Sequence, residues 1–171
     1  QLHRFAGEAA GDLCGWSVAM IPDIDGDNLA ECLVGEPKND RKAHDAGRVT
    51  MFSAGEDVGS VRGNQAGARF GYSMAAIGDV NWDGYVDIAI GSPYFDKGSK
   101  SNAGRIDVLS GAGGNRLWKM KGGKAGQRLG HCVANAGDLN GDGVNEVAVG
   151  APKFGNNKGR VYVRDGWSGV G

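Results

Sequence analysis

A segment of about 23 residues occurs three times in the chain, and this repetition limits the possible folds more than any other feature. The copies begin at Gly15, Gly71 and Gly130, so the spacings are 56 and 59 residues. A second shared segment follows each copy and contains G-R-[VI]-x-V or a close variant of it. A period of this length predicts repeated copies of one small structural unit rather than one continuous core.

Each unit reads as four short strands. Glycine is abundant, at 32 residues, and it separates short runs of alternating apolar and polar side chains. In the second unit these runs cover residues 71–76, 86–91, 105–110 and 116–122. Four antiparallel strands that recur at this period are typical of a β-propeller blade. A β-sandwich is the competing interpretation, and the threefold self-similarity disfavours it.

We therefore expect an all-β fold, a β-propeller with three four-stranded blades in one repeat domain that covers residues 1–171. Residues 1–14 would form a fourth strand for a closing blade, followed by a linker. The blades would cover residues 15–63, 64–122 and 123–171, and the last would lack its fourth strand because the chain ends with a third-strand sequence.

The number of blades raises the question of how the ring closes. Three blades are too few, since four to eight are usual. A half-ring would expose two blade faces and an unpaired strand edge. We expect a homodimer with six blades, in which strand exchange at the termini completes each last blade. A fragment of a longer chain and a nine-bladed trimer are the alternatives.

Half of the 20 acidic residues lie in three short loops, at the same place in each repeat. Oxygen side chains recur at positions 1, 3, 5 and 9, and position 6 is a residue that tolerates positive φ. Carboxylates this close repel one another unless a cation joins them. Oxygen ligands on a tight loop are typical of calcium, with a carbonyl at position 7 as a further ligand. The sequence predicts three Ca²⁺ ions per chain, held by Asp23, Asp25, Asp27, Leu29 and Glu31; Asp79, Asn81, Asp83, Tyr85 and Asp87; and Asp138, Asn140, Asp142, Val144 and Glu146.

Two other interpretations of these loops were weighed. An EF-hand needs a glutamate at position 12 and flanking helices. Position 12 is Val34, Ile90 or Val149, and the flanks alternate as strands do. The second alternative is an Asx-rich turn without any metal, and three copies with an acidic ninth position argue against it.

The repeats resemble FG-GAP repeats, which form the blades of integrin α-subunit propellers. The Phe-Gly opening is Phe70-Gly71 in the second copy, Leu129-Gly130 in the third and Cys14-Gly15 in the first. The Gly-Ala-Pro ending is conserved in form at residues 150–152, 91–93 and 35–37. The resemblance implies that the loop between strands one and two binds calcium. It also implies seven blades, a number that three repeats per chain cannot produce.

Several classes of function are disfavoured. The formal charge is −1, which argues against a nucleic-acid partner, and no apolar run is long enough for a membrane span. His3, His44 and His131 are scattered, and no nucleophile motif is present, so we expect no enzyme activity. Cys14, Cys32 and Cys132 align with small or apolar residues of the other repeats, and we expect them to be buried.

The expected function is a calcium-stabilised binding or adhesion module, extracellular, secreted or periplasmic. A protein or glycan ligand would bind on the face opposite the calcium loops, at the loops 38–45, 94–102 and 153–158, which mix cations with Tyr94, Phe95 and Phe154. A purely structural scaffold, or a part of a larger seven-bladed propeller, is the alternative function.

Overall fold

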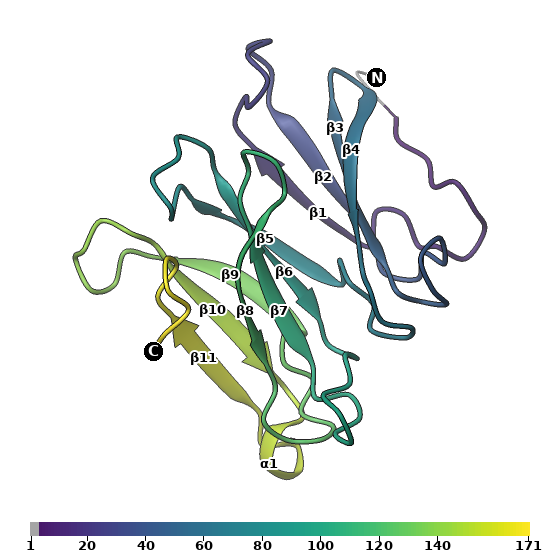
Figure 1. Cartoon of the computed structure of the whole chain (residues 1–171), viewed down its shortest axis with the longest axis vertical. Helices are drawn as coiled ribbons and strands as arrows, with labels where there is room; N and C mark the ends of the chain where they lie inside the picture. The colour runs from purple at the N-terminus through teal and green to yellow at the C-terminus, as the bar shows by residue number, and fades with distance from the viewer. Residues whose placement is uncertain (1–3) are drawn as a thin grey trace.

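The computed structural model describes residues 4–171, and the chain forms three antiparallel sheets that follow one another in sequence order (Figure 1). We call these sheets blade 1, blade 2 and blade 3. Blade 1 contains β1 (Ser17–Ile21), β2 (Glu31–Glu36), β3 (Arg48–Ser53) and β4 (Glu56–Arg62); blade 2 contains β5 (Ser73–Gly78), β6 (Asp87–Ser92), β7 (Arg105–Leu109) and β8 (Arg116–Lys121); blade 3 contains β9 (Cys132–Gly137), β10 (Glu146–Ala151) and β11 (Arg160–Arg164).

The strand order confirms the all-β fold and its division into blades. Blades 1 and 2 have four strands in meander order, and blade 3 has three, ordered β11-β10-β9. The predicted strands agree with the observed ones to within two residues. The short element α1 (Phe154–Asn157) is not a regular helix, because Gly155 and Asn156 both have positive φ, at 60° and 59°.

Two apolar cores lie between neighbouring blades, because alternate residues of each strand point to opposite faces of its sheet. Ile21, Leu33 and Val49 of blade 1 pack with Ile88 and Ile90 of blade 2. The other face of blade 2 packs on blade 3, through Ile77, Ala89, Ile106, Val108, Val147 and Val149. Each blade is therefore stabilised mainly by its neighbours, as in other repeat architectures.

The Phe-Gly opening of each later repeat attaches it to the preceding blade. Phe70 is 2% exposed, and its N–H donates to the carbonyl of Ala46 at 2.9 Å. Leu129 repeats this bond to Ala103 at 3.1 Å. The glycines that follow these alanines, Gly47 and Gly104, have φ of 87° and 82°, and a Cβ there would overlap with the backbone of Phe70 or Leu129. The motif is thus a blade-to-blade contact.

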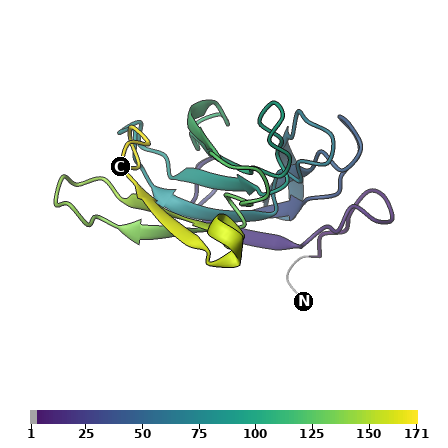
Figure 2. The same cartoon turned by 90° about the horizontal axis from the view of Figure 1, so that it is seen from below.

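The outer faces of blades 1 and 3 remain open at the two ends of the row (Figures 1 and 2). Val18 and Met20 on β1 are 63% and 58% exposed, and Val161 on β11 is 68% exposed. These are the open faces expected of a half-ring. Homodimerisation stays a prediction.

The N-terminal segment and the cysteines were also subjects of prediction. The predicted N-terminal strand falls partly on residues 1–3, outside the described residues, and residues 4–7 form no strand. The prediction that all three cysteines are buried was wrong: Cys14 and Cys32 are half-buried and Cys132 is exposed, because β9 turns its Cys132 side chain toward the open side of blade 3. Among the described residues, no helix combines the length and apolarity that a membrane crossing requires.

The antiparallel order places the loops at two ends of the blades. The acidic loops, which join the first and second strands, lie beside the turns between the third and fourth strands, since Ser53 and Ser110 contact carboxylates of these loops. The loops between the second and third strands, with the segments that link the blades, lie at the other end. We call this other end the opposite face.

Candidate metal centres and binding face

The acidic loops have the backbone shape that their sequence predicts. At position 6, Asn28, Gly84 and Gly143 have φ of 65°, 89° and 87°, so the expected sharp turn is confirmed in all three blades. At position 4 the loops also have positive φ, and in blade 2 the residue there is Trp82, with φ of 60°. The Trp82 ring is 70% exposed and lies beside Gly143 of the next loop.

The aspartate at position 1 organises each loop. Asp23 accepts backbone hydrogen bonds from Gly26 at 2.6 Å and Asn28 at 2.7 Å. Asp138 accepts the equivalent bonds from Gly141 and Gly143, at 2.7 and 2.9 Å. These N–H groups lower the pKa of Asp23 and of Asp138, so both are ionised at neutral pH. The loops are therefore preshaped around negative charge.

The acidic residue at position 9 is buried in every loop. Glu31 and Asp87 are fully buried and Glu146 is 5% exposed. Each accepts a hydrogen bond from the backbone N–H of position 2, for example from Val80 to Asp87 at 2.8 Å. Burial raises the pKa of Asp87, and the neighbouring carboxylates Asp83 and Asp79 raise it further. The Oε1 atom of Glu146 is buried without a hydrogen-bond partner, as expected of an oxygen that binds a cation.

The carboxylates come closest in the first and third loops. Ligand oxygens of Asp23, Asp25, Asp27 and Glu31 all lie within 4.8 Å of one another, and so do those of Asp138, Asp142 and Glu146. Asp79, Asp83 and Asp87 of the second loop, all among the described residues, do not form so tight a group. Asn81 instead donates to Asp83 at 2.8 Å. The oxygen-only donor set fits calcium, and the assignment of each ligand stays a prediction.

A serine from the turn between the third and fourth strands was missed in the sequence. Ser53 donates to Glu31 at 3.2 Å, and Ser110 donates to Asp83 at 2.8 Å. This hydrogen bond is one cause of the lowered pKa of Asp83, after that from Asn81. The sequence does contain a signal for this contact, because both serines stand at the end of the third-strand motif. Blade 3 has Asp165 at the same position.

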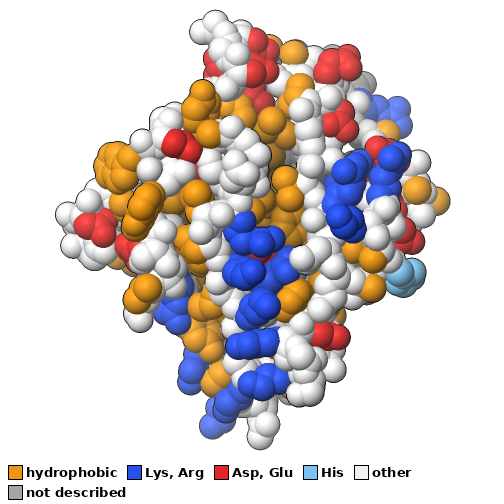
Figure 3. Space-filling view, viewed as in Figure 1, with side chains coloured by type: hydrophobic (Ala, Val, Ile, Leu, Met, Phe, Trp, Pro, Cys, Tyr) orange, Lys and Arg blue, Asp and Glu red, His pale blue; other side chains and the backbone are white. Residues whose placement is uncertain are grey.

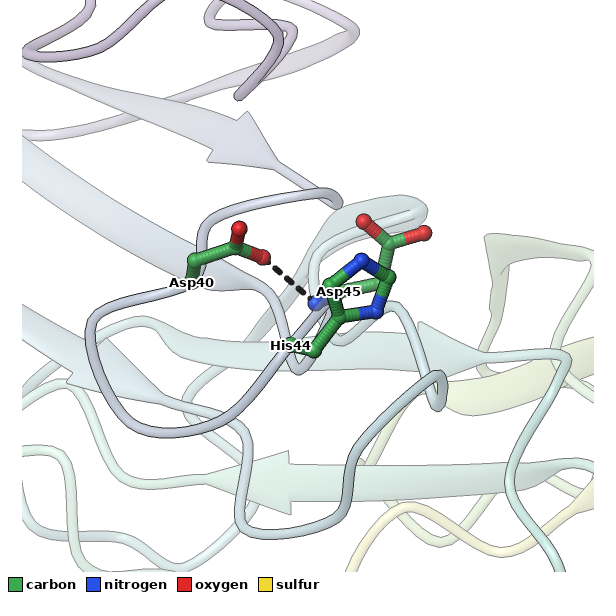
Figure 4. A group of neighbouring side chains, drawn as sticks. All are labelled: Asp40, His44 and Asp45. Atoms are coloured by element: carbon green, nitrogen blue, oxygen red, sulfur yellow. Dashed lines mark hydrogen bonds between the residues drawn. The ribbon is translucent and has the colours of Figure 1, made fainter.

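A further group of possible ligands, Asp40, His44 and Asp45, lies on the opposite face (Figure 4). Asp40 accepts the backbone N–H of Asp45 at 2.6 Å, and the Asp45 carboxylate pairs with Arg69 at 3.4 Å. Blade 2 repeats the first bond without a histidine, from Asn102 to Asp96 at 2.7 Å. We therefore interpret this group as a brace of the loop rather than a metal site.

An aromatic cluster lies on the opposite face, where the blades meet. Its centre is Tyr72, whose ring centroid lies 5.3 Å from Trp16, 5.1 Å from His131 and 5.9 Å from Tyr94. Trp16, Tyr72 and His131 occupy the same position in their repeats, directly after the glycine of the Phe-Gly pair. That recurrence was the signal that sequence reasoning overlooked. Burial and the neighbouring Arg128 lower the pKa of His131, which favours the neutral ring.

Two of the aromatic residues expected to bind ligand have structural contacts instead. Phe95 is only 7% exposed, and Phe154 packs against the core between blades 2 and 3. Tyr94 is half-buried, with Arg69 at 4.5 Å and Arg128 at 4.9 Å from its ring centroid. On the opposite face, the aromatic surface is therefore centred on Tyr72 and not on the loops between the second and third strands.

Comparison with known proteins agrees with this architecture. The family model of the FG-GAP repeat matches residues 70–109 and 133–163. Integrin alpha-V of Gallus gallus is 36% identical over 162 residues, which cover 89% of this chain and 15% of that protein. Integrin alpha-IIb of Homo sapiens is 32% identical, with coverage of 95% and 17%, and Integrin alpha-PS5 of Drosophila melanogaster is 31% identical, with coverage of 89% and 16%. The second and third repeats are therefore matched as FG-GAP repeats, and most of the chain is similar to integrin α subunits, of whose length it spans about a sixth.

Proposed function

We propose that the chain is a calcium-stabilised, non-catalytic binding module of the adhesion type, and that it works in an extracellular or periplasmic setting. One observation carries the proposal. Within residues 4–171, no Lys or Arg forms an ion pair with any of the ten carboxylates in the acidic loops. Charge this dense needs a counter-ion, and divalent cations at millimolar concentration outside the cell would supply it.

The proposed ligands are the side-chain oxygens at positions 1, 3, 5 and 9, with the carbonyl oxygen at position 7. The ion would join the exposed turn of each loop to the buried ninth residue at the start of the second strand. In this role calcium fastens the loop to its blade. Its sites would be made of protein ligands, and within residues 4–171 both histidines, His44 and His131, lie on the opposite face, which supports a structural rather than a catalytic role.

Loss of one ninth-position carboxylate should remove one ion. We expect Glu146→Gln to reduce the bound calcium from three ions per chain to two, because an amide is a weaker ligand and Glu146 Oε1 has no other partner. Native mass spectrometry in calcium-containing volatile buffer counts the ions. Glu56→Gln, an exposed change on β4, is the control that should leave three. Three ions in both variants would contradict the assignment.

The ligand would bind on the opposite face, around the Tyr72 cluster and the loops between the second and third strands. Trp16 is 51% exposed there, and Arg69 and Arg128 lie over the Tyr94 ring of the same cluster, so the surface combines aromatic area with positive charge. Aromatic and arginine side chains are enriched where proteins bind partners. This composition supports binding of a protein or glycan ligand.

We further propose that two chains assemble into a six-bladed ring by exchange of N-terminal strands. Phe5 stacks on Phe52 of β3, with centroids 4.2 Å apart. In sequence, Phe5 aligns with Met120 of β8, and Phe52 aligns with Arg164 of β11. Met120 and Arg164 are also in contact, at 3.3 Å. The equivalence of these two contacts supports the proposal that the N-terminal segment serves as the fourth strand of a preceding blade.

Solution mass tests the dimer. Light scattering in calcium should give about twice the 17.7 kDa of one chain. Val161→Glu should shift the mass to that of the monomer, because it places a charge on the open face of blade 3. Val58→Glu, on an exposed valine of β4, is the matched control. A wild-type monomer would instead support a piece of a larger propeller or a structural scaffold.

A further inference from the structure

Positive charge is concentrated in the second half of the chain. Residues 97–171 contain 12 of the 19 Lys and Arg residues and only five acidic residues, three of which belong to the third acidic loop. Of the remaining two, Asp107 is fully buried and bonded to Arg105 and Arg116. The overall charge of −1 therefore conceals a strongly basic region.

The fold gathers this charge on one side of the molecule. Figure 3 shows a column of Lys and Arg side chains over β8 and toward α1. Lys119 and Lys121 of β8 are exposed, as is Lys124 just beyond the strand. Lys100 reaches across to the same segment and donates to the carbonyl of Gly123 at 2.7 Å. Blade 3 adds the exposed residues Lys153, Lys158 and Arg160.

These cations are held by aromatic rings instead of carboxylates. The Phe154 ring has Arg160 at 3.8 Å and Lys124 at 5.1 Å from its centroid, and the Phe95 ring has Lys121 at 5.2 Å. A ring positions a cation without neutralising it. In blade 1, by contrast, Arg48 forms ion pairs with Glu36 and Glu8. The charges of Lys121, Lys124 and Arg160 therefore remain available to an anion.

A depression of about 490 Å³ lies within the basic region, between the segment 124–128 and the loop 153–157. Lys124, Arg128 and Lys153 line it together with Asn102 and Gln127. The loop adds two further amide residues, Asn156 and Asn157, to this lining. The depression thus combines cations with amide residues, which can hydrogen-bond to hydroxyl groups.

We propose that this depression and the adjoining column of cations bind a sulfated glycan. The proposal deepens the proposed function, on which it rests, by naming the chemical class of one ligand. Such a chain carries both kinds of group that the lining suits, since its sulfates would pair with Lys124, Lys153 and Arg128, and its hydroxyl groups would hydrogen-bond to the amide residues. An acidic peptide or a duplex of DNA matches the charge but presents few hydroxyl groups to these amides.

The test measures binding of a heparin dodecasaccharide to the full chain in calcium-containing buffer, by titration calorimetry over a range of salt concentrations. We expect K124Q/K153Q to weaken binding at least tenfold and to reduce the slope of log Kd against log salt by about two, because each lysine contact releases about one counter-ion. The control R4Q/R62Q makes the same charge change at two exposed arginines outside the basic region and the proposed binding loops, and it should leave Kd within twofold.

Competition experiments distinguish a sulfated glycan from other polyanions. Unsulfated hyaluronan, polyglutamate, duplex DNA and phosphatidylserine vesicles should each compete at least tenfold less well than heparin. Equal competition by any of them, or equal weakening by the control variant, would overturn the assignment. If heparin does not bind while three calcium ions are still counted, this inference fails and the calcium-stabilised module stands. If the chain binds no calcium, the proposed function itself fails.

Discussion

Removal of calcium should lower the midpoint of thermal unfolding by about 5–10 °C for each ion lost. An ion at a hundredfold excess over its Kd stabilises the folded state by about 2.7 kcal/mol. For a chain of this size, each kcal/mol shifts the midpoint by about 2–4 °C. Differential scanning calorimetry in 2 mM calcium and in EDTA measures the difference. The effect is expected to be large because three repeated loops depend on the same ion.

Magnesium and a loop variant serve as controls for this experiment. Magnesium demands a smaller octahedral shell and loses its waters reluctantly, so it should restore only a minor part of the lost stability. For E146Q, the difference between the unfolding midpoints in calcium and in EDTA should be about two thirds of the wild-type difference. The chain has four tryptophans, so the difference in fluorescence between the wild type and a Trp82→Phe variant gives a local readout of the third acidic loop, beside which the Trp82 ring lies. Identical melting curves in calcium and EDTA would contradict occupied sites.

The substitution Gly91→Ala should lower the free energy of unfolding by about 3 kcal/mol or more. Gly91 lies on β6, and a Cβ there would overlap with the carbonyl oxygen of Gly130 and the hydroxyl of Ser73. The same carbonyl accepts the Ser73 hydroxyl at 3.0 Å. Because backbone atoms of two blades meet at this point, neither can move aside without opening the core between them. Overpacking of a rigid contact commonly costs about 1–3 kcal/mol, and sometimes more.

The companion substitution Gly59→Ala separates this steric effect from the general effect of replacing glycine. Gly59 lies on β4 without positive φ, and a Cβ there would meet no atom within 4 Å. We expect a change within about 1 kcal/mol, in the stabilising direction. Urea denaturation of both variants in calcium gives the free energies of unfolding. Equal stabilities for the two variants would show that the blades do not meet as described.

The sequence predicted the blades well because their information is local and repeated. The short apolar runs of β2, β6 and β10 and the turn residues Asn28, Gly84 and Gly143 determine strand and loop without reference to distant residues. Three copies of each signal also allowed each position to be compared with its equivalents. The same comparison showed that positions 1, 5 and 9 of the acidic loops are acidic in every copy.

The features that were missed depend on contacts between blades. Nothing in the sequence near Phe95 or Phe154 indicates that these rings hold cations rather than bind ligand, since the arginine and lysine partners come from other strands. Cys132 was expected to be buried by analogy with its equivalents, Ser17 and Ser73, which face a neighbouring blade. Among residues 4–171, no further sheet packs on that side of blade 3. A side chain at this repeat position is therefore covered only in a blade that has another blade packed on that face.

The separation of acidic loops from the basic side has one more consequence. Three divalent ions would add six positive charges to a chain of formal charge −1. At neutral pH the metal-free protein should adhere to an anion-exchange resin, whereas the loaded protein should pass through it and be retained by a cation exchanger. The bound ions would thus change the net charge of the protein from negative to positive.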